Sequence, residues 1–252
     1  MTEVEDTPLP VRLTTEPLVD VVFEVRFFSA IAASNLLPGL LIRDRPQYNK
    51  FERLPAADIP EVVRNQEAAL AFSPLMRISA ERFSVQVGDK MFSLSCHIPY
   101  VGWVGFKEEI LSLVNLLLVG MPIDRITRFA LRYVNLLELK EPQLQVAAFN
   151  WQVTLGQHAV HDQPTLVRME IRQGQHVHAL QVATGATTVS AAGTKHGAIV
   201  DIDSYCECSI APTDFLSSTD ESLEVLHREN HVIFFSMLTN ATLQSLGPKY
   251  NE

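Results

Sequence analysis

The chain has 252 residues, of which 47% are hydrophobic and 19% are charged. This composition is typical of a folded globular protein and excludes a largely disordered one. The net charge of −9 disfavours nucleic acid as a partner, because non-specific binding to nucleic acid depends on a basic surface that neutralises phosphates.

No targeting segment is recognisable in the sequence. The first 20 residues lack the basic start and the apolar core of a secretory signal. The longest apolar run, 110–121, is shorter than the roughly 20 residues that span a bilayer. The three cysteines, Cys96, Cys206 and Cys208, form an odd, sparse set that is typical of a reducing compartment. We therefore expect a cytoplasmic protein that does not associate with membranes.

The first part of the chain predicts a leader, a strand and a short helix. Residues 1–17 contain three prolines and are expected to form an extended leader. Val19–Phe27 alternates between apolar and polar residues, which predicts a half-buried strand. Within 29–75, which has no clear role, a helix is expected at Asp58–Leu70.

The middle of the chain predicts a hairpin, a helix and a long strand. Met76–Ile98 alternates on both sides of Gly88-Asp89, a dipeptide that favours a tight turn. Trp103–Val119 has apolar residues at helical spacing, which predicts an amphipathic helix. Asp124–Leu139 follows with the two-residue period of a strand.

The second half repeats this order of elements. A loop is expected at Gly185–Gly193, and a long helix is expected to begin at Ser218, whose spacing to Glu221 is that of a capping box. Four strands are expected before that helix: Trp151–Leu155, Leu166–Arg172, Val177–Ala183 and Ala198–Cys208.

These elements predict an α+β fold with an extensive antiparallel sheet packed on two long helices. Residues 18–252 are expected to form one compact domain made of two halves, 18–140 and 149–248. The halves share an order of strands, hairpin and helix, but not sequence identity. A duplicated unit therefore stays open as an interpretation.

Two arginines on the strand Asp124–Leu139 are the leading candidate for a binding site. Arg128 and Arg132 lie on the face opposite Phe129, Leu131 and Tyr133. Guanidinium groups grip phosphates and carboxylates in bidentate fashion. Two further arginines are expected on neighbouring strands, so the candidate ligand or partner residues are Arg128, Arg132, Arg26 and Arg77.

The alternative interpretation of these arginines is structural. Glu24, Glu81, Glu138 and Glu170 fall on predicted strands or their ends, where they could pair with the arginines across a solvated sheet face. The sequence alone does not decide between a binding face and a face of internal ion pairs.

A second candidate site is acidic. Asp201 and Asp203 share one strand face, and Glu170 could join them from another strand to hold a divalent cation for phosphodiester cleavage. Arg172 stands where such a nuclease site needs a lysine, and an arginine stays charged and cannot act as a base. Exposed acidic residues on a half-wet strand are the alternative.

No other chemistry is indicated. The sequence has no Gly-x-Ser-x-Gly elbow, no Walker loop and no Gly-x-Gly-x-x-Gly fingerprint. We therefore expect no catalytic residues, no cofactor and no metal. Five histidines gather in the second half without a third ligand at a recognisable metal spacing: His158, His161, His176, His178 and His196.

Three stretches carry a resemblance. They are PLVDVVFEVRF at Pro17–Phe27, RFALRYVNLLEL at Arg128–Leu139 and LHRENHVIFFSMLTNATLQSLGP at Leu226–Pro248. With them the chain resembles a sporadically distributed bacterial protein family of unassigned function. The resemblance implies a cytoplasmic prokaryotic protein of one compact α+β architecture, in the setting of mobile elements or defence systems. It supplies no catalytic residues.

The expected function is therefore that of a non-enzymatic binding or accessory protein. It is expected to recognise a protein partner or a small anionic ligand through the sheet face that carries Arg128 and Arg132. The alternative is a metal-dependent phosphohydrolase or nuclease that uses Asp201, Asp203 and Glu170. A third interpretation has the arginines holding nucleic acid directly, with steep salt dependence. The sequence does not indicate an oligomeric state.

Overall fold

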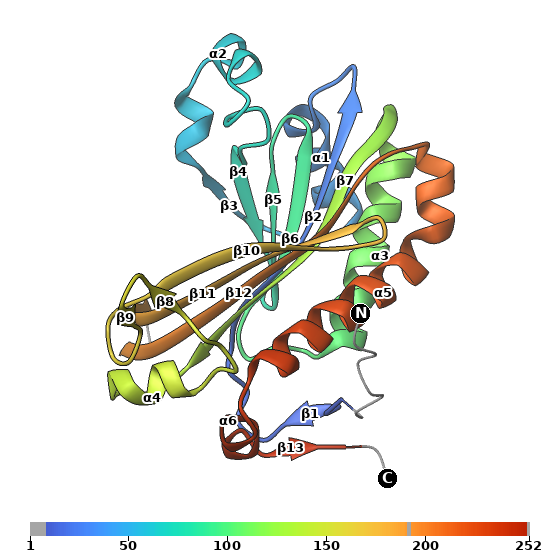
Figure 1. Ribbon diagram of the computed structural model, residues 1–252. Helices are drawn as coiled ribbons and strands as arrows, with labels where there is room; N and C mark the ends of the chain where they lie inside the picture. Colours follow the sequence, from blue (N-terminus) through green and yellow to red (C-terminus); the bar gives the residue numbers. More distant parts are fainter. Residues whose placement is uncertain (1–8, 191–192, 251–252) are drawn as a thin grey trace.

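The computed structural model describes residues 9–190 and 193–250. Its centre is one nine-stranded antiparallel sheet, in the order β10-β11-β12-β7-β2-β6-β5-β4-β3 (Figure 1). The α+β class predicted from the sequence is confirmed. The strands are β2 (Leu18–Ser29), β3 (Lys50–Arg53), β4 (Met76–Ser79), β5 (Phe83–Val87), β6 (Met91–Cys96), β7 (Ile123–Leu137), β10 (Leu166–Gln173), β11 (His176–Ser190) and β12 (Gly193–Ile210).

The central pair, β2 and β7, follows directly from residue alternation. Along β7, Phe129, Leu131 and Tyr133 are buried on one face, whereas Arg132 on the other face is exposed. Side chains alternate between the faces of a strand, so a two-residue apolar period buries one face only. The predicted separation of Phe129, Leu131 and Tyr133 from the two arginines is confirmed.

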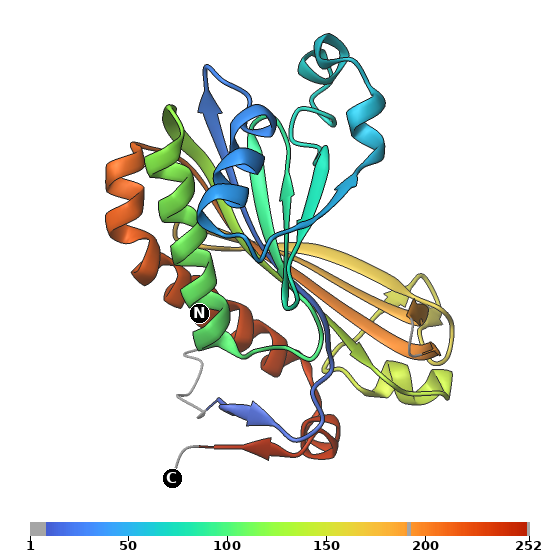
Figure 2. The ribbon, with the colours of Figure 1, turned by 180° about the vertical axis from the view of Figure 1, so that it is seen from behind.

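Two long helices lie against the face that carries the aromatic residues (Figures 1 and 2). In α3 (Trp103–Gly120), the buried residues include Phe106, Ile110 and Val114 at helical spacing. The helix α5 (Pro212–Met237) packs on β7, β12 and α3. The shorter helices are α1 (Ala33–Asp44), a 3₁₀ helix (Pro55–Asp58), α2 (Glu61–Gln66), α4 (Pro142–Ala147) and α6 (Asn240–Ser245).

Four boundaries differ from the sequence prediction. The strand expected at Trp151–Leu155 is limited to Thr154–Leu155. The helix α5 begins at Pro212, six residues before Ser218, because proline suits a first turn and Ser218 Oγ donates back to the carbonyl of Asp214 at 2.9 Å. The strands β11 and β12 pair through most of the expected loop, of which residues 191 and 192 lie outside the described residues. The helix expected at Asp58–Leu70 is limited to Glu61–Gln66.

The two ends of the described chain are paired. The strand β1 (Arg12–Leu13) lies antiparallel to β13 (Pro248–Lys249) (Figure 1). A separate small hairpin consists of β8 (Thr154–Leu155) and β9 (His158–Ala159). The Thr14 N–H donates to the carbonyl of Gly247 at 2.9 Å. Gly247 has a φ of +65°, which glycine adopts without strain. Part of the predicted leader is thereby held against the domain.

None of the helices in the described ranges is long and apolar enough to cross a membrane. Both predicted halves contribute strands to the same sheet, and β7 of the first half pairs with β12 of the second half at the junction. The interpretation that the two halves arose by duplication of one unit is not tested by this arrangement.

Candidate functional site

The open face of the sheet, opposite α3 and α5, carries the predicted arginines. Arg26 on β2 and Arg128 on β7 are direct cross-strand neighbours. Glu24 Oε1 accepts a hydrogen bond from Arg26 Nε at 2.7 Å and another from Arg128 Nη1 at 2.6 Å. One carboxylate therefore bridges two guanidinium groups that would otherwise repel each other.

The Arg128 side chain contacts a second carboxylate and an aromatic ring in addition to Glu24. Its Nη2 donates to Asp203 Oδ2 at 2.6 Å, and its guanidinium lies 4.4 Å from the centre of the Tyr205 ring. The Arg128 side chain is only 11% exposed. Burial raises the pKa of Asp203, and the positive charge of Arg128 opposes that rise. Arg128 thus acts in the structure as the centre of an ion-pair network.

The other predicted arginines also hold carboxylates. Arg132 makes a bidentate pair with Asp201, at 2.8 and 2.6 Å, and its side chain is 46% exposed. Arg77 pairs with Glu52 at 2.8 Å. Arg77 lies on β4, which is the third strand from β2 in the sheet. Three strand spacings are roughly 14 Å, so Arg77 lies apart from the group. Ligand binding by these arginines stays a prediction. An anion that binds to them must first displace the carboxylates with which they are paired.

The acidic alternative loses its free ligands in the same network. Asp201 and Asp203 are paired with Arg132 and Arg128, as described above. Glu170 faces Ala179, which in turn faces Asp203, so one whole strand separates the two carboxylates. Two strand spacings separate the backbones of Glu170 and Asp203 by roughly 10 Å. Within residues 9–190 and 193–250, no three His, Cys, Asp or Glu residues are arranged to hold a metal ion.

The histidines of the second half divide into separate environments. His176 and His178 lie under α5, where His176 Nδ1 is 2.7 Å from Glu229 Oε2 and His178 Nδ1 is 2.8 Å from Ser204 Oγ. Burial lowers the pKa of His178. His176 and His178 are two residues apart on β11 and therefore share one face of the strand. Their contacts account for both histidines as parts of a polar network beneath the helix.

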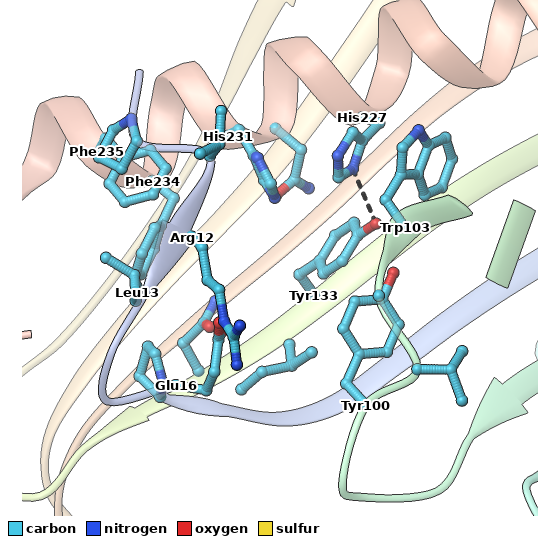
Figure 3. A pocket seen from close by; sticks show the side chains of 18 of the residues that line it. Arg12, Leu13, Glu16, Tyr100, Trp103, Tyr133, His227, His231, Phe234 and Phe235 are labelled. Carbon is cyan, nitrogen blue, oxygen red and sulfur yellow. Dashed lines mark hydrogen bonds between the residues drawn. The ribbon is translucent and has the colours of Figure 1, made fainter. Parts of the chain in front are cut away.

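A concavity lies on the helix-covered side of the sheet. We call it the aromatic pocket: a cavity of about 570 Å³ between α5, β7, the 98–103 turn and the N-terminal segment (Figure 3). The side chains that line it include five aromatic rings and two imidazoles: Tyr100, Trp103, Tyr133, Phe234, Phe235, His227 and His231. Ligand cavities in proteins commonly have this size and this kind of lining.

His227 is the best-anchored side chain of the pocket. Its Nδ1 is 2.9 Å from the Tyr133 hydroxyl, and its ring stacks on Trp103 with centres 4.0 Å apart and planes 8° apart (Figure 3). The Trp103 indole N–H is fixed by Glu224, which lies 3.1 Å away on α5. The ring of His231 lies 4.0 Å from that of His227, one helical turn further on. The helix crossing thus holds a rigid aromatic wall.

Both imidazoles are uncharged at neutral pH. Burial lowers the pKa of His227 to about 2, with smaller contributions from His231 and Lys107. Burial also lowers the pKa of His231 to about 4. A base with so low a pKa accepts a proton poorly near pH 7. The two imidazoles therefore contribute ring contacts and hydrogen bonds in their neutral form.

Two buried polar atoms of pocket residues lack a partner within the described chain. One is the Tyr100 hydroxyl, which forms no well-aligned hydrogen bond although it lies near the Tyr133 phenol. The other is Asn230 Oδ1. Asn230 Nδ2 donates to the carbonyl of Ile202 at 3.1 Å and to Ser204 Oγ at 2.9 Å. A carbonyl only accepts, so the unpaired Asn230 atom is the oxygen.

The N-terminal segment forms the outer wall of the pocket. Arg12 and Glu16 both lie on this side (Figure 3). The carbonyl of Pro17 accepts from the Leu136 N–H at 2.8 Å, and the Val11 N–H donates to the carbonyl of Lys249 at 2.8 Å. The wall is therefore tied to β7 at one end and to the C-terminal strand at the other.

The aromatic pocket was not among the sites predicted from the sequence. One signal was present: His227 and His231 are four residues apart in a helix, beside Phe234 and Phe235 on an otherwise apolar stripe. A histidine among the apolar positions of a helix face is thus the sequence pattern that could have indicated the pocket.

The cysteines add no nucleophile. Cys96, Cys206 and Cys208 are free thiols, and burial raises the pKa of each. A thiol reacts as its thiolate, so a raised pKa lowers its reactivity at neutral pH.

No protein-family model and no curated protein matches this chain. The resemblance of its three patterned segments to a bacterial family therefore stays a prediction.

Proposed function

We propose that this protein is a non-enzymatic binding protein whose ligand site is the aromatic pocket. The observation that carries the proposal is a cavity of about 570 Å³ whose walls bring together five aromatic rings and two imidazoles. A ligand in such a cavity covers apolar ring surface, which is favourable.

The charges of the open face support placing the site in the pocket instead. Arg26, Arg128 and Arg132 stand among Glu24, Asp201 and Asp203, so positive charges and negative charges cancel. A small anion has no excess of positive charge to attract it to such a face. The ion pairs thus favour a structural role for these arginines and no second function there.

The state of the pocket histidines supports binding without catalysis. His227 and His231 are held neutral, with pKa values of about 2 and about 4. The three cysteines are free thiols, two of them buried and Cys208 half-buried, which suits a reducing cytoplasm. We place the function there, as an accessory protein of a bacterial cell.

The proposal is tested by calorimetric titration with four probes: indole, indole-3-carboxylate, tryptamine and cyclohexanol. We expect saturable binding of at least one probe with one site per chain. Absence of binding by all four contradicts the proposal.

A blocking variant locates the site. Ile98 lines the pocket and is 51% exposed, so Ile98→Trp adds bulk at the rim without disturbing the core. We expect it to abolish binding of the probe. The matched control is Val119→Trp, at a 76% exposed position on α3 outside the pocket, which leaves binding unchanged. Equal binding by both variants places the probe elsewhere and contradicts the proposal.

A further inference from the structure

The outer strand β10 leaves one edge of the large sheet unpaired. It stands at the end of the strand order, and among the described residues β11 is the strand that pairs with it (Figure 1). A strand in this position presents a row of unpaired N–H and C=O groups on its outer side. Six of the eight residues of β10 are also exposed. The outer edge of β10 is therefore accessible to a strand of another chain.

The two edges of the sheet differ in how they are protected against such pairing. At the opposite edge, β3 has four residues and begins with Lys50. Short edge strands and lysine side chains both discourage pairing between sheets. The strand β10 has eight residues, LVRMEIRQ, with neither lysine nor proline. The length and composition of β10 therefore favour pairing, whereas those of β3 disfavour it.

The order of residues in β10 is complementary to that of a second copy of the same strand. We consider an antiparallel pair of β10 strands with Met169 of each copy at the centre. Arg168 of each copy then faces Glu170 of the other, and Val167 of each faces Ile171 of the other. Cross-strand pairs of opposite charge and pairs of apolar residues both stabilise a sheet. This register therefore matches charge with opposite charge and apolar residues with apolar residues.

The two neighbouring registers bring like charges together. Facing residues lie on the same side of the joined sheet, so the centre of a symmetric pair moves one residue at a time. A centre at Arg168 places the two copies of this arginine opposite each other. A centre at Glu170 opposes two glutamates and also sets Arg168 against Arg172. Like charges directly opposite each other destabilise a pair of strands, so charge favours the centre at Met169.

The register centred on Met169 also gives the longer of the two pairings that match charges. It joins residues 166–172 of the two copies, whereas a centre at Ile171 joins residues 169–173. At its ends Leu166 faces Arg172, whose side chain is 72% exposed. The methylene groups of an arginine cover apolar surface while its charge stays in water. The end pairs are thus compatible with the same register.

We propose that this protein forms a two-fold symmetric dimer in which β10 pairs antiparallel with β10 of a second copy, centred on Met169. The pairing joins two nine-stranded sheets into one continuous sheet. A two-fold interface uses the same surface of both subunits, which a self-complementary strand provides. None of the residues of β10 lines the aromatic pocket, so the dimer is independent of the proposed ligand site.

Two charge reversals test the interface by analytical ultracentrifugation of the whole chain over a series of concentrations. We expect the unchanged chain to dimerise reversibly. Arg168→Glu opposes two acidic groups at each of two symmetric contacts, and Glu170→Arg opposes two basic groups there. We expect each single variant to raise the dissociation constant of the dimer about tenfold or more. Both positions are exposed, so the circular dichroism of each variant should equal that of the unchanged chain.

An equimolar mixture of the two variants tests the register. In a mixed pair, two acidic groups of one chain face two basic groups of the other, so opposite charges meet again at both contacts. We expect the mixture to dimerise at least as tightly as the unchanged chain. The matched control is Lys50→Glu, a charge reversal at an exposed position on the other edge strand. We expect this control to dimerise like the unchanged chain.

Three results would overturn the proposal. A monomer at every concentration means that β10 does not pair with a second copy. A dimer that neither reversal weakens, or that only Lys50→Glu weakens, has its interface elsewhere. Two weakened single variants whose mixture does not regain the dimer contradict the pairing of Arg168 with Glu170.

Discussion

The two faces of the sheet treat their polar groups in opposite ways. On the open face, Arg128 and Arg132 each hold carboxylates at hydrogen-bond distance. On the helix-covered face, Tyr100 and Asn230 keep buried polar atoms without partners beside a cavity. The open face has the conspicuous charges, and the covered face has the unmet hydrogen bonds.

This difference teaches where a ligand gains most. A group that already has its partner gives a ligand little, because one interaction is exchanged for another. The walls of the aromatic pocket present ring surface to a cavity, which a ligand covers without displacing a partner. We therefore infer that the charged face stabilises the fold and that the pocket binds.

The largest expected effect is that of acid on the pocket. In the unfolded chain both histidines titrate near pH 6.5, but in the fold burial lowers the pKa of His227 to about 2 and that of His231 to about 4. Below pH 6.5 the unfolded chain therefore binds more protons, and the free energy of unfolding falls. Two histidines at about 1.4 kcal/mol per pH unit each remove at most about 4 kcal/mol between pH 6.5 and 5.

Urea unfolding at pH 6.5, 6.0, 5.5 and 5.0 measures this slope. In His231→Gln we expect the slope to fall by the share of one histidine. The matched control is His161→Gln, an exposed position, which keeps the slope of the unchanged chain. Identical slopes in all three proteins mean that the pocket imidazoles are not desolvated as described.

The next effect concerns the open face. Arg128→Ala removes a nearly buried guanidinium and leaves Asp203 without its closest partner. We expect a loss of about 2 kcal/mol in the free energy of unfolding, within the range for broken buried pairs after allowance for partial exposure. Arg132→Ala, at a 46% exposed pair, should cost about 0.5 kcal/mol. Chemical denaturation measures both.

The binding side of the same pair sharpens the comparison. Neither Arg128→Ala nor Arg132→Ala should change the affinity for the pocket probe, provided that titrations are run where each variant is folded. If both variants keep the stability of the unchanged chain but lose binding of the probe, the ligand binds at the arginine face and the assignment to the pocket is contradicted.

The smallest effect distinguishes two tyrosine hydroxyls of the pocket. Tyr133→Phe loses the contact with His227 Nδ1 at 2.9 Å and should cost about 1 kcal/mol. Tyr100→Phe removes a hydroxyl without a well-aligned partner and should leave stability unchanged or slightly higher. Thermal unfolding of the two matched variants gives the order directly. A larger loss in Tyr100→Phe shows that this hydroxyl already has a partner.

Much of the fold could be predicted because the alternation of residues encodes it locally. The β2 and β7 strands and the helix α3 follow from periods of two and 3.6 residues. The start of α5 was predicted wrongly because Ser218 and Glu221 have capping-box spacing, although Pro212 and Asp214 suit a first turn as well.

The site could not be predicted in the same way. The pocket needs Tyr100, Tyr133 and His227 to meet, and they come from segments far apart in the chain. Their meeting depends on the crossing of α3 and α5 over the sheet, which residue periodicity does not specify. The arginines were noticed because charge is visible in a sequence, but their partners on other strands depend on register.

One measurement tests the central claim most directly: titration of the ¹⁵N-labelled protein with indole, followed by nuclear magnetic resonance. The signal of the Trp103 indole N–H reports on the pocket, and the Nε–H signals of Arg128 and Arg132 report on the open face. Trp151, whose indole N–H donates to the carbonyl of Val146, is the internal control. We predict that the Trp103 signal shifts with saturation while the arginine and Trp151 signals stay in place. Shifts of the arginine signals with an unmoved Trp103 signal contradict the account.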